Sequence, residues 1–181
     1  MSRLPRLRSL LPAVLCLFVA LASPAAALDI REVVSPGGIR AWLVQDATAP
    51  VISMSFAFSG GAALDPDGRE GASRMMAALL DEGAGPYDAA AFAAEVEAIA
   101  ARLSFGADAD NVTGSLRSLV DTRERAFELL GLALAQPRFE PAAIERVRAQ
   151  MASGLRSSAS SPNWVAGRVL SETLFAGHPY A

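Results

Sequence analysis

The chain has 181 residues, 52% of them hydrophobic, so a disordered polypeptide is excluded and about one domain is expected. Its formal net charge is −3 and all 16 basic residues are arginine, so it lacks the basic excess of a nucleic-acid-binding protein. Only one histidine and one cysteine are present. Composition therefore excludes most catalytic zinc sites and most nucleophile-and-base arrangements.

Residues 1–27 have the three parts of a secretory signal peptide. Three arginines lie in the first eight positions, an apolar stretch covers 10–21, and alanines occupy 25–27. The apolar stretch is shorter than the ~20 residues of a membrane-spanning helix. We therefore predict cleavage after Ala27 and export to the periplasm or beyond, with a retained anchor as the alternative. Cleavage removes three arginines, no acid and the only cysteine, which takes the net charge from −3 to −6 and excludes disulfides.

After residue 28 the sequence has the pattern of two strands. An apolar run over 39–44 follows a Pro-Gly-Gly turn, and over 51–58 large apolar residues alternate with serine and alanine. A period of two indicates a strand with one buried and one more exposed face. The segment 60–68, rich in glycine and aspartate, is typical of a polar loop.

Two helices are predicted next. Apolar residues at i, i+3, i+4, i+7 and i+8 cover 72–80, and this spacing places Met75 and Met76 in the core. Asp88 is a favoured N-cap residue, and the helix after it has an apolar stripe that begins at Phe92.

A hairpin follows, with strands over 103–107 and 111–119. Asp108 and Asp110 lie in the tight connection between them. Two acids at such a place are interpreted as turn formers rather than as a metal-binding or acid–base pair.

Three helices follow the hairpin. Asp121 and Glu124 have capping-box spacing for the first, and Pro141 and Pro162 stand at the first position of the other two. The expected buried residues of the first two are Phe127, Leu130, Leu134, Ile144, Val147, Met151 and Leu155. Runs of strands followed by runs of helices favour an α+β fold, in which a mixed or antiparallel sheet is layered against helices.

Several short motifs follow one another in a characteristic order. They are Gly60-Gly61-Ala62-Ala63-Leu64-Asp65-Pro66, Gly71-Ala72, Asp81-Glu82-Gly83, Tyr87-Asp88, Arg138-Phe139-Glu140-Pro141, Ser161-Pro162 and Gly177-His178-Pro179-Tyr180. In this order they resemble the N-terminal half-domain of the insulinase, pitrilysin and mitochondrial processing peptidase family of zinc peptidases. The resemblance covers nearly all of 28–181 and implies the fold of that half-domain, with a second, similar half expected after residue 181.

The catalytic motif of this family is H-x-x-E-H, in which two histidines one helical turn apart bind zinc and the glutamate is the general base. The resemblance places Ser73 and Ala77 where the histidines would be, and Met76 where the glutamate would be. A further glutamate ligand, on a later helix, aligns with Gly154. The resemblance therefore implies a chain with no zinc of its own and no peptidase activity.

In this family paired clamshell halves build a peptidase chamber. The resemblance implies that this chain forms a hetero-oligomer with a zinc-bearing homologous subunit and helps to hold an extended peptide. Segment 103–107 matches the strand that borders the catalytic cleft, so Ser104, Phe105 and Gly106 are the candidate peptide contacts, with an interior strand as the alternative. Two other functions stay open: an exported peptide-binding or scaffold protein with no peptidase partner, and a peptidase whose ligands lie in another segment.

Overall fold

The computed structural model describes residues 29–180, so the predicted signal peptide at 1–27 lies outside the described residues. The described residues divide into two compact units, 29–49 and 50–180. Within the described part of the chain, no helix is long and apolar enough to cross a membrane.

The described part of the first unit is a hairpin. β1 (Ile30–Val34) pairs antiparallel with β2 (Arg40–Val44), and the turn between them is closed by a hydrogen bond from the Gly38 N–H to Ser35 O (2.9 Å). β2 confirms the strand predicted over 39–44. β1 was not predicted, because Ile-Arg-Glu-Val-Val has no period-two alternation and becomes a strand by pairing with β2.

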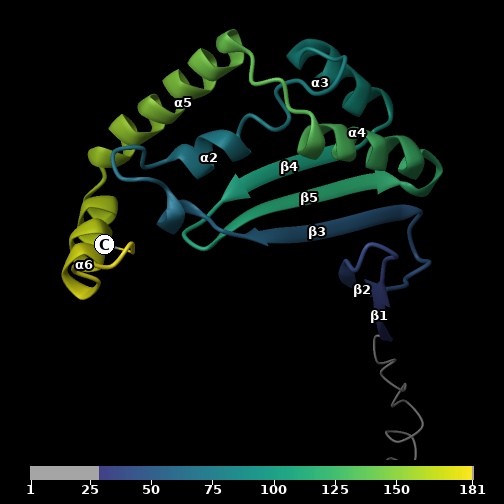
Figure 1. Cartoon of the computed structure of the whole chain (residues 1–181), viewed down its shortest axis with the longest axis horizontal. Coiled ribbons are helices and arrows are strands. Elements are labelled where there is room, and N and C mark those ends of the chain that lie inside the picture. The colour runs from purple at the N-terminus through teal and green to yellow at the C-terminus, as the bar shows by residue number, and fades with distance from the viewer. Residues whose placement is uncertain (1–28, 181) are drawn as a thin grey trace, which may run out of the picture. The chain divides into compact units, whose positions relative to one another are not determined.

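The second unit is built on a three-stranded antiparallel sheet with the order β3 (Val51–Ser59), β5 (Asn111–Leu119), β4 (Arg102–Ala107). Figure 1 shows helices on one face of this sheet. Alternate side chains on this covered face pack under helix α4 (Arg123–Ala135). The other side chains form the open face. The α+β class is confirmed, and the predicted strand ends agree within one residue.

Helices and two short 3-10 turns occupy the connections and the C-terminal part. They are the turn Ala62–Leu64, α2 (Ala72–Ala77), α3 (Ala89–Ala98), the turn Val120–Thr122, α4, α5 (Pro141–Ala159) and α6 (Pro162–Leu174). Asp88 caps α3 as predicted, because its carboxylate accepts a hydrogen bond from the Ala91 N–H (2.8 Å). Pro141 and Pro162 open α5 and α6, also as predicted.

Three buried clusters join these elements. Phe92 of α3 packs with Leu129 of α4, and Leu79 packs with Val147 of α5. The third cluster lies between β5 and α4, around Leu116. Phe92, Leu116 and Leu129 are the largest fully buried side chains, so α3, α4 and β5 carry most of the core.

One predicted helix end and one predicted helix start were wrong. The helix expected over 72–80 ends at Ala77, and its first residue, Ala72, is exposed. Asp121 and Glu124 form no capping box, because a 3-10 turn precedes α4 and the N-cap residue Thr122 makes no side-chain capping hydrogen bond.

The predicted buried faces of α4 and α5 were wrong at three positions. Phe127, Leu134 and Leu155 are 42%, 37% and 58% exposed. On α4 the fully buried residues include Ala126 and Ala133 instead. Alanine adds little to an apolar pattern, yet its small side chain lets a helix lie close to a sheet, so the true face was offset from the predicted one.

Candidate functional site

One carboxylate holds the N-terminus of α2. Asp65 accepts hydrogen bonds from the Gly71 N–H (2.7 Å), the Ser73 N–H (2.9 Å) and the Ser73 hydroxyl (2.5 Å). The hydroxyl bond is the largest cause that lowers the pKa of Asp65 from its ordinary value. Ser73, at the position of the first missing histidine, is thereby part of the helix start.

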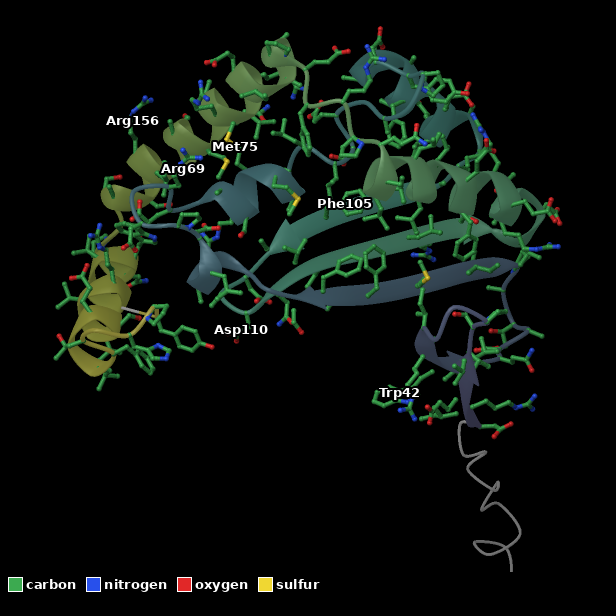
Figure 2. The ribbon with its side chains drawn as sticks, in the orientation of Figure 1. Trp42, Arg69, Met75, Phe105, Asp110 and Arg156 are labelled. Carbon is green, nitrogen blue, oxygen red and sulfur yellow. The ribbon has the colours of Figure 1, made fainter. Side chains whose placement is uncertain are left out.

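The other two positions of the missing motif are covered to different extents. Ala77 is 0% exposed and Met76 is half-buried. Met75 lies between α2 and α5 (Figure 2) and packs against Leu79 and Val147. Met75 therefore packs against the core as predicted, although both Met75 and Met76 are only partly buried. The closely packed surroundings of Ala77 have no space for an imidazole ring without displacement of neighbours.

The position of the further zinc ligand is open to solvent. Gly154 on α5 is exposed, and a Cβ atom there would meet nothing within 4 Å. Among residues 29–180, no three His, Cys, Asp or Glu side chains lie together as a metal site requires. His178 packs instead against the rings of Phe175 and Tyr180. The residues at these positions therefore do not fit the family's zinc ion.

β4 is an edge strand, because within the described residues it pairs only with β5. The Asp108 N–H donates to Asn111 O (2.9 Å) across the hairpin. In an antiparallel pair such bonds involve every second residue, so the N–H and C=O groups of Leu103, Phe105 and Ala107 point away from β5. The predicted strand therefore has a free edge beside α2, which packs against β4.

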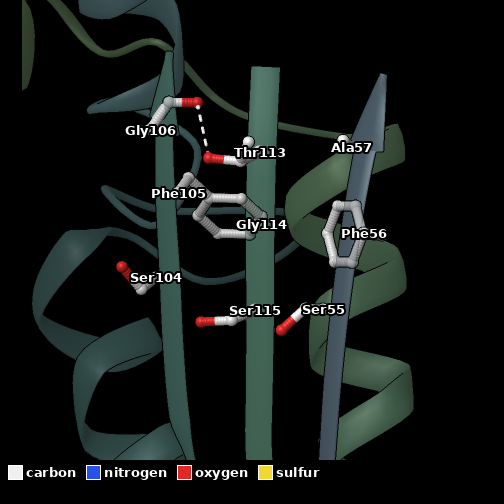
Figure 3. Close-up of a pocket in the computed structure, with 9 residues that line it drawn as sticks. All are labelled: Ser55, Phe56, Ala57, Ser104, Phe105, Gly106, Thr113, Gly114 and Ser115. Atoms are coloured by element: carbon white, nitrogen blue, oxygen red, sulfur yellow. Dashed lines mark hydrogen bonds between the residues drawn. The ribbon is translucent and has the colours of Figure 1, made fainter. Parts of the chain in front are cut away.

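An open hollow of about 580 Å³ lies over the middle of the sheet, and Figure 3 shows the residues that line it. Ser104, Phe105 and Gly106, the predicted contact residues, all belong to this lining. Phe56, Gly114 and Phe105 stand side by side across the three strands, and a Cβ on Gly114 would lie 2.2 Å from the Phe56 ring. Glycine at 114 thus leaves the space that the Phe56 ring occupies, on the face of the sheet that packs under α4. Contact of this surface with a peptide stays a prediction.

The two acids of the β4–β5 connection are structural. Asp108 accepts hydrogen bonds from the Asp110 N–H and the Asn111 N–H (both 2.8 Å), which lower its pKa. Asp110 accepts a hydrogen bond from the Tyr180 hydroxyl, which raises the pKa of Tyr180. Gly61 lies against this turn, where a Cβ would be 2.3 Å from Asp108 O. The interpretation as turn formers is confirmed.

Sequence reasoning missed two parts of this region. Asp65 was assigned only to a polar loop, because a carboxylate six residues before Gly71 matches no standard capping spacing. Arg102 and Arg117, directly opposite each other on β4 and β5, were also missed. The tight turn between β4 and β5 fixes the register of the hairpin, and this register could have predicted that Arg102 and Arg117 lie opposite each other.

The fold and these positions can be compared with known proteins. The family model described as insulinase (peptidase family M16) matches residues 40–181, so the chain belongs to the insulinase family of peptidases. A curated relative, the non-peptidase homolog YmxG of Helicobacter pylori, is 29% identical over 132 residues, which are 73% of this chain and 31% of that protein. The chain therefore spans about a third of the length of this relative.

Solved structures show the same fold. A peptidase M16 inactive domain from Pseudomonas fluorescens has a TM-score of 0.79 at 28% identity, over 85% of this chain and 38% of that one. Pitrilysin has a TM-score of 0.72 at 19% identity, over 87% of this chain and 17% of its own. A protease from Helicobacter pylori has a TM-score of 0.73 at 17% identity, over 85% of this chain and 37% of that protease. These neighbours confirm the half-domain fold expected from the sequence.

Proposed function

We propose that this chain is a non-catalytic, exported member of the insulinase family that pairs with a zinc-bearing homologue and helps to hold an extended peptide. The proposal depends mainly on one observation: residues at the positions of the lost zinc motif contribute to the folded structure instead. The Ser73 hydroxyl bonds to Asp65, and Ala77 is fully buried. The names of two relatives, a non-peptidase homolog and an inactive domain, support the same conclusion.

The size of the related proteins supports the expectation of a partner. This chain matches 38% of the inactive-domain chain and 17% of pitrilysin, as one half-domain of a larger arrangement does. A domain without zinc ligands contributes to cleavage through a subunit that has them. Zinc is therefore expected in the partner and not in this chain.

The peptide-binding role rests on the free edge of β4. Outward-pointing main-chain groups at Leu103, Phe105 and Ala107 can pair with an added strand, whatever the side chains of the peptide. The hollow beside them leaves room for the peptide's own side chains. Edge pairing of this kind needs none of the lost motif residues.

Backbone methylation of a peptide tests the edge directly. The probe is an acetylated, amidated heptapeptide of alternating valine and threonine, N-methylated on either of its two sets of alternate amides. We expect methylation of one set to weaken binding at least about tenfold and methylation of the other to be tolerated, because only one set faces β4. Equal effects of the two sets, or no binding of the parent peptide, would contradict the proposal.

Export and partnership need separate tests. Mass spectrometry of the exported protein should give a mature N-terminus at Leu28, whereas a chain that retains Met1 in the membrane fraction would show an anchor. Mixed with a zinc-bearing homologue from the same cell, the chain should co-elute and raise peptide cleavage. Cleavage that is unchanged by the chain would contradict the role in a shared chamber.

A further inference from the structure

The open face of the sheet has hydroxyl groups at its centre and two guanidinium groups at one end. One row across the strands consists of Ser55, Ser115 and Ser104, and the next of Ser53, Arg117 and Arg102. None of the three strands contains an acidic residue. This face therefore has positive charge with no compensating carboxylate of its own.

The positions of the two arginines destabilise the sheet. Arg102 and Arg117 are both exposed and directly opposite on neighbouring strands, an arrangement that destabilises a sheet because the charges repel. Among residues 29–180, eight arginines form ion pairs with carboxylates, and neither of these two is among them. An anionic group from outside the domain would offset the repulsion.

The register of β4 places such a group beside the free edge. Arg102 forms a hydrogen-bonded pair with Arg117, so a strand added to β4 would face Arg102 in a non-hydrogen-bonded pair, where side chains approach most closely. The side chain of that peptide residue points to the open face, as that of Arg102 does. The far end of β4 has the charged turn residues Asp108 and Asp110, which disfavour an acid there.

We infer that this domain selects extended peptides with an aspartate or glutamate opposite Arg102, whose carboxylate is bound by the guanidinium groups of Arg102 and Arg117. Charge-assisted bonds from arginine to a carboxylate are among the stronger hydrogen bonds of proteins. The inference rests on the proposed pairing of a peptide with β4. It adds a substrate class to that pairing, together with the register in which the peptide lies.

The test uses the full chain and three acetylated, amidated heptapeptides of alternating valine and threonine whose central residue is glutamate, glutamine or arginine. Isothermal titration calorimetry in low salt should show the glutamate peptide bound about tenfold more tightly than the glutamine peptide, and the arginine peptide most weakly. The difference should shrink in high salt, because both guanidinium groups are exposed to solvent.

Surface variants assign the preference to named residues. Arg102→Gln should abolish the preference for glutamate, and Arg117→Gln should reduce it less, because Arg117 lies one strand further from the edge. Arg148→Gln is the matched control, an exposed arginine of α5 that pairs with Glu145, and should leave the preference unchanged. The affinity of each variant for the glutamine peptide is measured as well, because it reports binding to the edge of β4 without the carboxylate.

The outcomes separate this inference from the function on which it rests. Equal affinities for the glutamate and glutamine peptides, with both still sensitive to backbone methylation, overturn the inference and leave the proposed function intact. Failure of every peptide to bind overturns both. A larger loss from Arg117→Gln than from Arg102→Gln would contradict the position of the carboxylate opposite Arg102 and would overturn the inference.

Discussion

α2 and β4 pack against each other, yet they differ in whether the positions with a function in the family take part in the fold. On α2 the positions of the lost motif take part in the fold, through the Ser73 bond to Asp65 and the full burial of Ala77. On β4 the outward main-chain groups and the hollow beside them have no partner within the described residues. Metal chemistry depends on particular side chains, whereas strand addition depends on backbone, so the second can survive the loss of the first.

Restoring a histidine on α2 is expected to have the largest effect on stability. Ala77→His should lower the free energy of unfolding by about 2–4 kcal/mol, because the ring overpacks a closed site and buries polar nitrogens. Ala78→His, one residue on and exposed, is the matched control and should cost far less. Similar urea midpoints for the two variants would show that position 77 faces open space.

Two glycines of the sheet that contains β4 allow a second test of stability. Gly114→Ala should cost about 1–3 kcal/mol, because its Cβ would overlap the Phe56 ring at 2.2 Å. Gly106→Ala should be tolerated, since the nearest atom to a Cβ there is the Thr113 hydroxyl at 3.5 Å. Thermal unfolding of both variants measures the difference, and equal losses would contradict the close approach at 114.

The Ser73–Asp65 contact predicts a smaller effect that depends on pH. Ser73→Ala should cost about 1 kcal/mol at neutral pH, with Ser53→Ala, at an exposed serine, as the control. Because the folded pKa of Asp65 is lowered, its stabilising contribution is present above the unfolded pKa of about 3.9 and is lost as the pH falls through the folded value. The cost of Ser73→Ala should therefore shrink in this acidic range, and a cost independent of pH would contradict the contact.

The smallest effect concerns the arginine pair. Arg117→Gln should stabilise the free domain by about a few tenths of a kcal/mol in low salt, because it relieves the repulsion from Arg102. High salt should remove the gain. Urea unfolding at two ionic strengths gives the measurement, and a loss of stability would show that Arg117 has a structural role.

The sequence predicted the elements of the second unit well and its local contacts less well. Alternation over 51–58 and the Asp108–Asp110 turn identified the sheet, because pleat and hairpin follow from short-range pattern. The buried face of α4 was offset, since Ala126 and Ala133 pack there and Phe127 does not. The loss of the zinc motif was evident from residue identity, whereas the role of Ser73 depends on Asp65, which only the folded loop brings near.

Zinc content tests the central claim most directly. The purified chain is washed with chelator, reloaded with zinc, passed through a desalting column and measured by metal analysis. Because Ser73, Met76 and Ala77 supply neither the two histidines nor the glutamate of the motif, and Gly154 no further ligand, we expect far less than one zinc per chain. About one tightly held zinc per chain would contradict the assignment of α2 to structure rather than catalysis.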